Sequence, residues 1–464
     1  MGLTQNAAGR RIETLLDANS FIEIGAQVAA RSTDFNLSAA QTPSDGVITG
    51  FGTIDGNLVY IFSQDVTVLG GTIGEMHAKK ITRLYSLARK TGAPVIGIID
   101  CGGVRLEEST DALNALGRIM RSQVLASGVV PQITAVFANC GGGLSLVPAL
   151  SDFTFIETEN AHLFVNSPDA IEGNNAGKLE TSGADYQLEQ GHVDFAGTET
   201  EVLDAMRQLV ALLPLNCEDE GAMEPTGDDL NRACTGLAGM KGNAADMLRM
   251  ISDSGIFFET KRGYATGMVT GFIRLNGYTI GAVANRGDAA SLQAKGIRKA
   301  AGFIRFCDAF NIPVLTLANA QTFENDMETE SILPDAGARL VSAYVNATVP
   351  KVTVITGKAY GSAYILMGSK AVGADMVFAW PDSEVGVMDP KMAAKIMCDG
   401  ADAATLKKTA AAYSDLQQNV TSAARHGYVD TIISDADTRK YVIGAFEMLY
   451  TKREDRPDKK HGTI

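Results

Sequence analysis

The chain has 464 residues, of which 45% are hydrophobic and 20% are charged. This balance is typical of a globular protein with buried cores and excludes disordered and collagen-like chains. Acidic residues outnumber basic ones by 54 to 40, so the formal net charge is −14. Such a charge argues against a protein that coats nucleic acid, although a local basic pocket for an anionic ligand stays open.

The first residues and the cysteines point to a cytoplasmic protein. Residues 1–20 contain four charged side chains and no apolar run of the signal-peptide kind. The six cysteines lack CxxC and Cys/His spacing, so we expect reduced thiols, and the five scattered histidines predict no metal site. The uncharged stretch 122–151 is interrupted by Pro131, three glycines and Pro148. It therefore predicts a buried strand, a tight turn and a helix rather than insertion into a membrane.

Two segments of similar design predict β-hairpins. Segment 52–65 (GTIDGNLVYIFSQD) and segment 271–285 (GFIRLNGYTIGAVAN) each contain two apolar strands joined by a turn on Asp or Asn with Gly. Further landmarks recur at an offset of 219 positions: Pro94 against Pro313, and Gly142 against Gly361. Landmarks in the same order at one offset indicate a duplication.

Each half reads as an α/β unit with crossover helices. An apolar strand follows Pro94 and Pro313, and a helical pattern precedes each proline. The predicted buried positions of these helices are Ile73, His77, Ile81, Leu84 and Ala88 in one half and Ile297, Ala300, Ile304, Cys307 and Phe310 in the other. A polar, turn-rich linker places the domain boundary near residues 222–239. We therefore predict domains at 1–221 and 240–464.

Glycine turns after strands are the strongest chemical signal. Gly102-Gly103 and the triple glycine 141–143 each follow an apolar strand, and 357–363 (GKAYGSA) repeats the second of these turns in the other half. Glycine at such a turn lets backbone N–H groups point into a shared space, where they form an oxyanion hole. No G-x-S-x-G elbow or phosphate-binding P-loop competes. A pair of backbone-built anion holes suits a reaction that passes through an enolate.

Longer motifs resemble one enzyme family. These are Asp45-Gly46-Val47-Ile48-Thr49-Gly50, 70–80 (GGTIGEMHAKK) and 303–313 (FIRFCDAFNIP). The chain resembles the carboxyltransferase subunit of biotin-dependent acyl-CoA carboxylases and sodium-pumping acyl-CoA decarboxylases, such as propionyl-CoA carboxylase beta and methylmalonyl-CoA decarboxylase alpha. The resemblance implies two tandem crotonase-like domains of the α/β class. It leaves open the acyl group and the direction of carboxyl flow.

The resemblance also implies a mechanism and partners. The first domain is expected to bind a coenzyme A thioester, with Gly142 and Gly143 holding the enolate oxygen. The second is expected to bind biotin carried on a separate carrier protein, with Ser362 and Ala363 at the urea oxygen. Further partners implied are a biotin carboxylase or membrane decarboxylase subunits, and copies of this chain in a dimer-based ring of six. The expected substrate-binding positions are Gly102, Gly103, Tyr360, Gly361 and Ile365, with Lys79 and Lys80 near the phosphates.

Some positions depart from the family pattern and keep alternatives open. A glycine pair reads Gly361-Ser362, a Pro-Gly-Phe turn reads Gln321-Thr322-Phe323, and a Met-Gly-Pro reads Met388-Asp389-Pro390. Asp389 would place a carboxylate close to a hole for an anion. One alternative is therefore a biotin-independent acyl-CoA decarboxylase or another crotonase-type enzyme. The other is a catalytically weak paralogue with an assembly role in a mixed complex.

Overall fold

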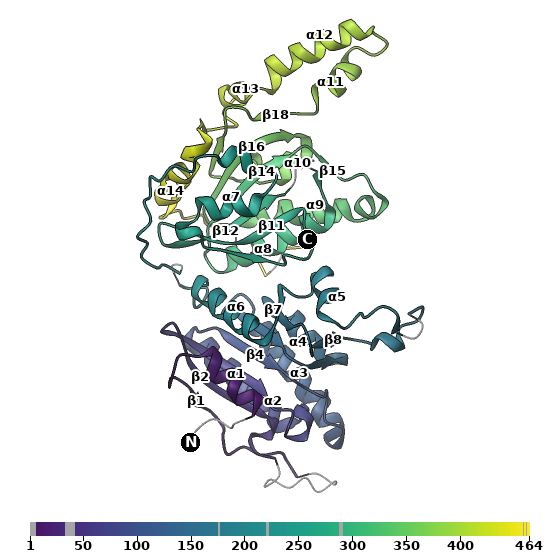
Figure 1. Ribbon diagram of the computed structural model, residues 1–464, viewed down its shortest axis with the longest axis vertical. Helices are drawn as coiled ribbons and strands as arrows, with labels where there is room; N and C mark the ends of the chain where they lie inside the picture. Colours follow the sequence, from purple (N-terminus) through teal and green to yellow (C-terminus); the bar gives the residue numbers. More distant parts are fainter. Residues whose placement is uncertain are drawn as a thin grey trace. The chain divides into compact units, whose positions relative to one another are not determined.

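The computed structural model describes residues 6–32, 42–174, 177–219, 222–286, 291–457, 459–460 and 462–464. The chain forms two compact units, Met1–Ala222 and Met223–Ile464, coloured purple to teal and teal to yellow in Figure 1. Residues 223–239, expected in the linker, belong to the second unit. Cys234 donates its backbone N–H to the carbonyl of Ala436 at 2.8 Å, and both Cys234 and Leu237 are buried in that unit's core.

A seven-stranded sheet forms the first unit. Its strands lie in the order β1 (Ile22–Glu23), β2 (Val47–Ile54), β3 (Asn57–Gln64), β4 (Val95–Ile99), β5 (Gln132–Val136), β7 (Phe153–Glu157) and β9 (Phe195–Gly197). The pairs β1–β2 and β2–β3 are antiparallel, and the remaining pairs are parallel. The predicted hairpin is confirmed, because Asp55 and Gly56 have φ of 49° and 80°, the left-handed values that a tight hairpin turn needs.

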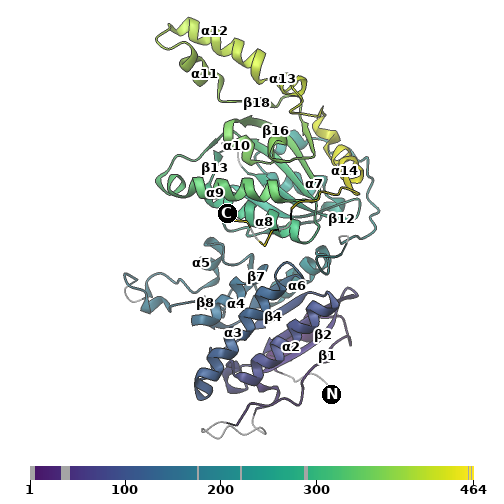
Figure 2. The ribbon, with the colours of Figure 1, turned by 180° about the vertical axis from the view of Figure 1, so that it is seen from behind.

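Helices cover both faces of this sheet (Figures 1 and 2). On one face α2 (Glu75–Thr91) packs against α3 (Ser109–Ala126), and on the other α1 (Ala7–Leu15) packs against α6 (Glu199–Leu212). The residues predicted for the apolar face of α2 are all buried. One of them, Ile73, lies before the helix begins and forms a β-bridge with Val104. Shorter elements complete the unit: β6 (Asn139–Gly141), α4 (Leu146–Ala149), β8 (His162–Phe164) and α5 (Ala184–Glu189).

The second unit repeats the first sheet, which confirms the duplication. Its strands lie in the order β10 (Phe257–Thr260), β11 (Met268–Leu275), β12 (Tyr278–Asn285), β14 (Val314–Ala320), β16 (Lys351–Tyr360), β17 (Met376–Ala379) and β19 (Thr431–Ile432). The antiparallel and parallel pairs follow in the same sequence as before. In addition, β18 (Glu384–Gly386) pairs with the end of β16, and β13 (Ser291–Leu292) pairs with β15 (Thr322–Phe323).

Helices of the second unit also form two layers. Figure 2 shows α8 (Ala294–Ala309) beside α9 (Met327–Asn346), while α7 (Ala244–Ile251) and α14 (Thr438–Leu449) contribute to the core on the other face. The positions predicted on α8 are buried, and Phe310 is its C-cap. The unit continues with α10 (Gly361–Leu366), α11 (Pro390–Met397), α12 (Ala403–Tyr413) and α13 (Val420–Arg425). Every helix in the described ranges is too short or too polar to cross a lipid bilayer.

Candidate active site

The first glycine turn joins β6 to a helical turn. Gly142 has φ of 62° and begins a 3₁₀ turn, Gly142–Ser145, that leads into α4. The first N–H groups of such a turn have no acceptor within it, and no side chain caps this one. The hydroxyl of Ser145 donates to the carbonyl of Gly142 at 2.7 Å, which fixes the turn from inside. Gly143 is exposed.

The second unit has the same arrangement at the predicted place. Strand β16 ends at Tyr360, and α10 begins at Gly361 with φ of 53° and no side-chain cap. A Cβ at Gly361 would lie 2.9 Å from the carbonyl oxygen of Val387, so glycine is required both by conformation and by space. Ser362 is exposed and Ala363 is buried. Ser362 keeps the backbone N–H of the glycine that it replaces in the family pattern.

The turn at Gly102 and Gly103 differs from expectation. The N–H of Gly102 donates to the carbonyl of Gly70 at 2.9 Å, and that of Gly103 donates to the Cys101 sulfur at 3.3 Å. These amides are therefore engaged within the protein and are not free donors for an oxyanion. The turn instead presents a surface without side chains, with Gly102 exposed.

Hydrogen bonds tie this turn to its neighbours. The carbonyl of Gly103 accepts from Ile73 N–H at 2.9 Å, and Cys101 N–H donates to the carbonyl of Asn139 at 3.1 Å. Asn139 begins β6, which runs directly into the Gly142 turn. The segments 70–73, 101–103 and 139–142 are thus held together as one backbone assembly.

A buried ionic cluster supports this assembly. Arg105, 1% exposed, donates to the carboxylates of Asp45 and Glu108, each at 2.7 Å. It also donates to the carbonyl of Thr72 at 2.8 Å, and Glu108 accepts from the N–H of Glu75 at the start of α2. Because a buried charge needs partners, the cluster fixes the loop before α2 relative to the turn after β4. The spacing of these residues in the sequence gave no signal of this contact.

His77 lies beside the cluster in its neutral form. Burial, and then the nearby Arg105, lowers the pKa of His77 to about 3. Gln64 accepts from the N–H of Asp100 through its carbonyl oxygen, so its amide group faces the His77 Nε2, at 3.2 Å. The Nδ1 of His77 therefore carries the proton and donates to the carbonyl of Asp45 at 2.9 Å. His77 thus joins α2 to the end of β3 and to the turn that precedes β2.

The expectation that Lys80 meets phosphates is wrong. Lys80 is 6% exposed, and its ammonium group donates to the carbonyl oxygens of Ser44 and Val47. Burial lowers its pKa to about 8. Lys80 lies three residues after His77 and four before Leu84, which places it on the buried face of α2. Lys79 is exposed and remains available to an anion.

The second-unit turn has acidic neighbours. The hydroxyl of buried Tyr360 donates a hydrogen bond to the carboxylate of Glu384. Burial, and then this bond, raises the pKa of Tyr360, so its hydroxyl stays protonated. Asp389 is the N-cap of α11 and accepts from the N–H groups of Lys391 and Met392 at 2.9 and 3.4 Å. The carboxylate therefore has a local role in starting α11.

The remaining predicted positions are also located. Ile365 is 42% exposed on α10, which excludes a core position within this chain. All six cysteines are free thiols, four of them buried. Among the described residues, no group of three or more His, Cys, Asp or Glu side chains is arranged to hold a metal ion.

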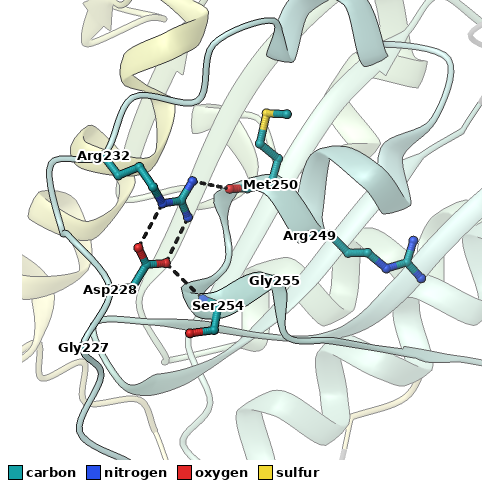
Figure 3. Close-up of a pocket in the computed structure, with 7 residues that line it drawn as sticks. All are labelled: Gly227, Asp228, Arg232, Arg249, Met250, Ser254 and Gly255. Carbon is teal, nitrogen blue, oxygen red and sulfur yellow. Dashed lines mark hydrogen bonds and ion pairs between the residues drawn. The ribbon is translucent and has the colours of Figure 1, made fainter.

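A pocket near the start of the second unit lies apart from these turns in the sequence. It has a volume of about 580 Å³, and Figure 3 shows Arg232 bound to Asp228 and to the carbonyl of Met250. Arg249 points away from that pair and bonds Asp246 at 2.9 Å. The cationic groups of this pocket are already paired, so it serves to anchor residues 223–239 on the second unit.

The chain belongs to the carboxyl transferase domain family, which it matches over residues 5–464. It is 40% identical to the propionyl-CoA carboxylase beta chain of Roseobacter denitrificans over 475 residues, covering 98% of this chain and 93% of the relative. It is 39% identical over 476 residues to methylmalonyl-CoA decarboxylase subunit alpha of Veillonella parvula, covering 98% and 92%. A crystal structure of transcarboxylase 12S, described as a hexamer assembly with methylmalonyl-CoA and methylmalonic acid bound, matches with a TM-score of 0.93 and 36% identity, covering 98% and 92%.

These matches confirm the family that the motifs indicated and the crotonase-like fold of the chain. The chain is a carboxyltransferase, and the family favours this activity over the two alternatives. The substitutions at Ser362, Thr322 and Asp389 occur within a chain that otherwise matches its relatives nearly end to end.

Proposed function

We propose that this carboxyltransferase moves a carboxyl group between biotin on a separate carrier protein and the α-carbon of a short-chain acyl-CoA. The observation that carries the proposal is the repeated turn. In both units a strand ends at a glycine of positive φ, and an uncapped helical turn begins there. The chain thus has two sites where backbone N–H groups can bind a negative oxygen, one for the thioester oxygen and one for the urea oxygen of biotin.

The first unit is proposed to hold the acyl-CoA. The N–H groups of Gly142 and Gly143 would donate to the thioester oxygen as the α-proton leaves and the enolate forms. Because the turn is fixed by Ser145 and by the bonds to segments 70–73 and 101–103, these donors are in place before the reaction. Gly102 and Gly103 would line the site as a surface without side chains.

The second unit is proposed to hold the biotin. The residues fit its urea oxygen, since the N–H groups of Ser362 and Ala363 lie in the first turn of α10, which no side chain caps. Biotin supplies or accepts the carboxyl group when it is bound. The chain's part is to orient the urea oxygen through the first turn of α10.

The working assembly is proposed to be a ring of six built from dimers, with a carrier protein and carboxylase or decarboxylase subunits as partners. The hexamer described for transcarboxylase 12S supports this proposal. Light scattering at micromolar concentration tests it, and a monomer would contradict it.

Carboxyl transfer itself is tested with malonyl- or methylmalonyl-CoA labelled in the carboxyl group. The purified chain is incubated with and without free biotin, and loss of label from the thioester is measured. We expect loss that depends on biotin. Equal loss in both conditions would indicate a biotin-independent decarboxylase. No loss in either, even with carrier protein supplied, would indicate the assembly role.

A further inference from the structure

Four lysines line one cleft in the second unit, which we call the lysine cleft. It has a volume of about 610 Å³ and lies between the end of β16, β18 and the helices α11 and α12. Its cationic side chains are Lys358, Lys391, Lys395 and Lys407.

The ammonium groups of the cleft have no anionic partners. In the described part of the chain none of the four forms an ion pair or a side-chain hydrogen bond. Two carboxylates also line the cleft: Glu384 accepts from Tyr360, and Asp389 accepts from the first N–H groups of α11. The lining therefore has four lysines against two acidic residues and keeps an excess of cations. Four like charges around one space repel one another, and an anion placed among them relieves that repulsion.

The residue types define the ligand. Lysine ammonium groups bind phosphate as point charges, and several of them spread around a cleft favour a ligand with more than one negative group. Pro390, Ala403, Leu406 and Ala410 add an apolar wall beside the charges. The volume lies within the range of small-molecule sites. The ligand class is therefore an organic molecule with two or more phosphate groups.

We propose that the lysine cleft binds a nucleotide carrying at least two phosphate groups. Coenzyme A is one source of this chemistry, and a free adenine nucleotide is the other. Binding of coenzyme A would deepen the proposed function and rests on it. Binding of phosphate groups by the cleft does not depend on the proposed function.

Calorimetry at low ionic strength tests the proposal on the full chain. The probes are adenosine 3′,5′-bisphosphate, ADP, coenzyme A and pantetheine, which lacks the phosphates. The variant is Lys391→Gln/Lys395→Gln/Lys407→Gln, and Lys408→Gln is the matched control, because Lys408 follows Lys407 on α12 and does not line the cleft. We expect the triple variant to bind the bisphosphate at least tenfold more weakly and the control to bind it as the wild type does.

Two further measurements are the salt dependence of binding and the comparison of coenzyme A with the bisphosphate. Raising the salt from 50 to 200 mM should weaken the wild type more than the triple variant. If the triple variant binds both coenzyme A and the bisphosphate more weakly than the wild type does, the cleft binds the substrate. If only the bisphosphate is bound more weakly, the cleft binds a free nucleotide. Equal affinity of the wild type and the triple variant for every probe, or no binding at millimolar concentration, would overturn the proposal. Failure of biotin-dependent transfer with bisphosphate binding intact would overturn the proposed function alone.

Discussion

The backbone N–H of Cys101 donates to the carbonyl oxygen of Asn139 at 3.1 Å and so bonds the turn after β4 to the strand that leads into Gly142. The second unit makes the corresponding tie with a side chain. Lys358, the counterpart of Asn139 at the offset of 219, donates its backbone N–H to Oδ1 of Asn319 at 3.0 Å. A Cβ at Gly357 would lie 2.5 Å from the same oxygen. Both anion turns are therefore held from the preceding strand, by different groups.

We predict that Gly361→Ala lowers carboxyl transfer about 100- to 1000-fold, the usual cost of losing one oxyanion donor. The left-handed backbone alone costs about 1–2 kcal/mol with a Cβ, and the Val387 oxygen at 2.9 Å forces the turn to shift. Initial rates of transfer to biotin measure the effect. Gly142→Ala is the comparison, because nothing lies within 4 Å of its Cβ. A Gly361→Ala rate within a few-fold of wild type would contradict this account of the second turn.

Arg105→Met should destabilise the chain by about 3–5 kcal/mol, because it leaves the buried carboxylates of Asp45 and Glu108 without their cation. Arg31→Met is the control, since its ion pairs with Glu75 and Asp111 are exposed and such pairs contribute little to stability. Urea unfolding followed by circular dichroism measures both. We also expect Arg105→Lys to recover part of the stability and to show a raised KM for acyl-CoA. Equal losses for Arg105→Met and Arg31→Met would argue against the cluster.

The sequence predicts the scaffold better than the side-chain contacts. The hairpins follow from Asp55-Gly56 and Asn276-Gly277, because their left-handed turn is local chemistry. The duplication follows from landmarks at one offset. The Arg105 cluster joins residues 60 positions apart, and no local pattern encodes that contact. The burial of Lys80 can be predicted from the helical periodicity of α2, because this residue shares a face with His77 and Leu84.

His77 predicts a loss of stability in acid. Its pKa is about 3 in the folded chain and 6.5 in the unfolded chain, so the unfolded state binds an extra proton as the pH falls below 6.5. Stability should fall by up to ~1.4 kcal/mol per pH unit from this group between about pH 6.5 and 3. Burial raises the pKa values of Asp45 and Asp100, which act in the opposite direction. The difference between wild type and His77→Gln, followed by thermal unfolding across this range, isolates the histidine. A difference independent of pH would contradict the neutral form.

Asp389→Asn should leave carboxyl transfer within about threefold of wild type. An Asn side chain accepts the same N–H groups of Lys391 and Met392, so α11 keeps its cap while the negative charge is removed. Asp389→Ala removes the cap as well, and we expect it to cost about 0.5–2 kcal/mol. A large rise in transfer for Asp389→Asn would show instead that the carboxylate repels the anion at the second turn.

Ile365 should help to select the acyl group. It follows the Gly361 turn on α10 and is 42% exposed, so Ile365→Asp removes little buried apolar area and the fold should tolerate it. If the side chain faces the acyl pocket, the charge disfavours longer chains more than acetyl, because each added methylene loses an apolar contact.

The measurement is the ratio of kcat/KM for acetyl-, propionyl- and butyryl-CoA, with thermal unfolding and light scattering confirming that fold and assembly are kept. Ile365→Val is the conservative control and should preserve the wild-type ratio. An unchanged ratio in Ile365→Asp would remove this residue from the acyl site, and a changed assembly state would place it at a subunit contact.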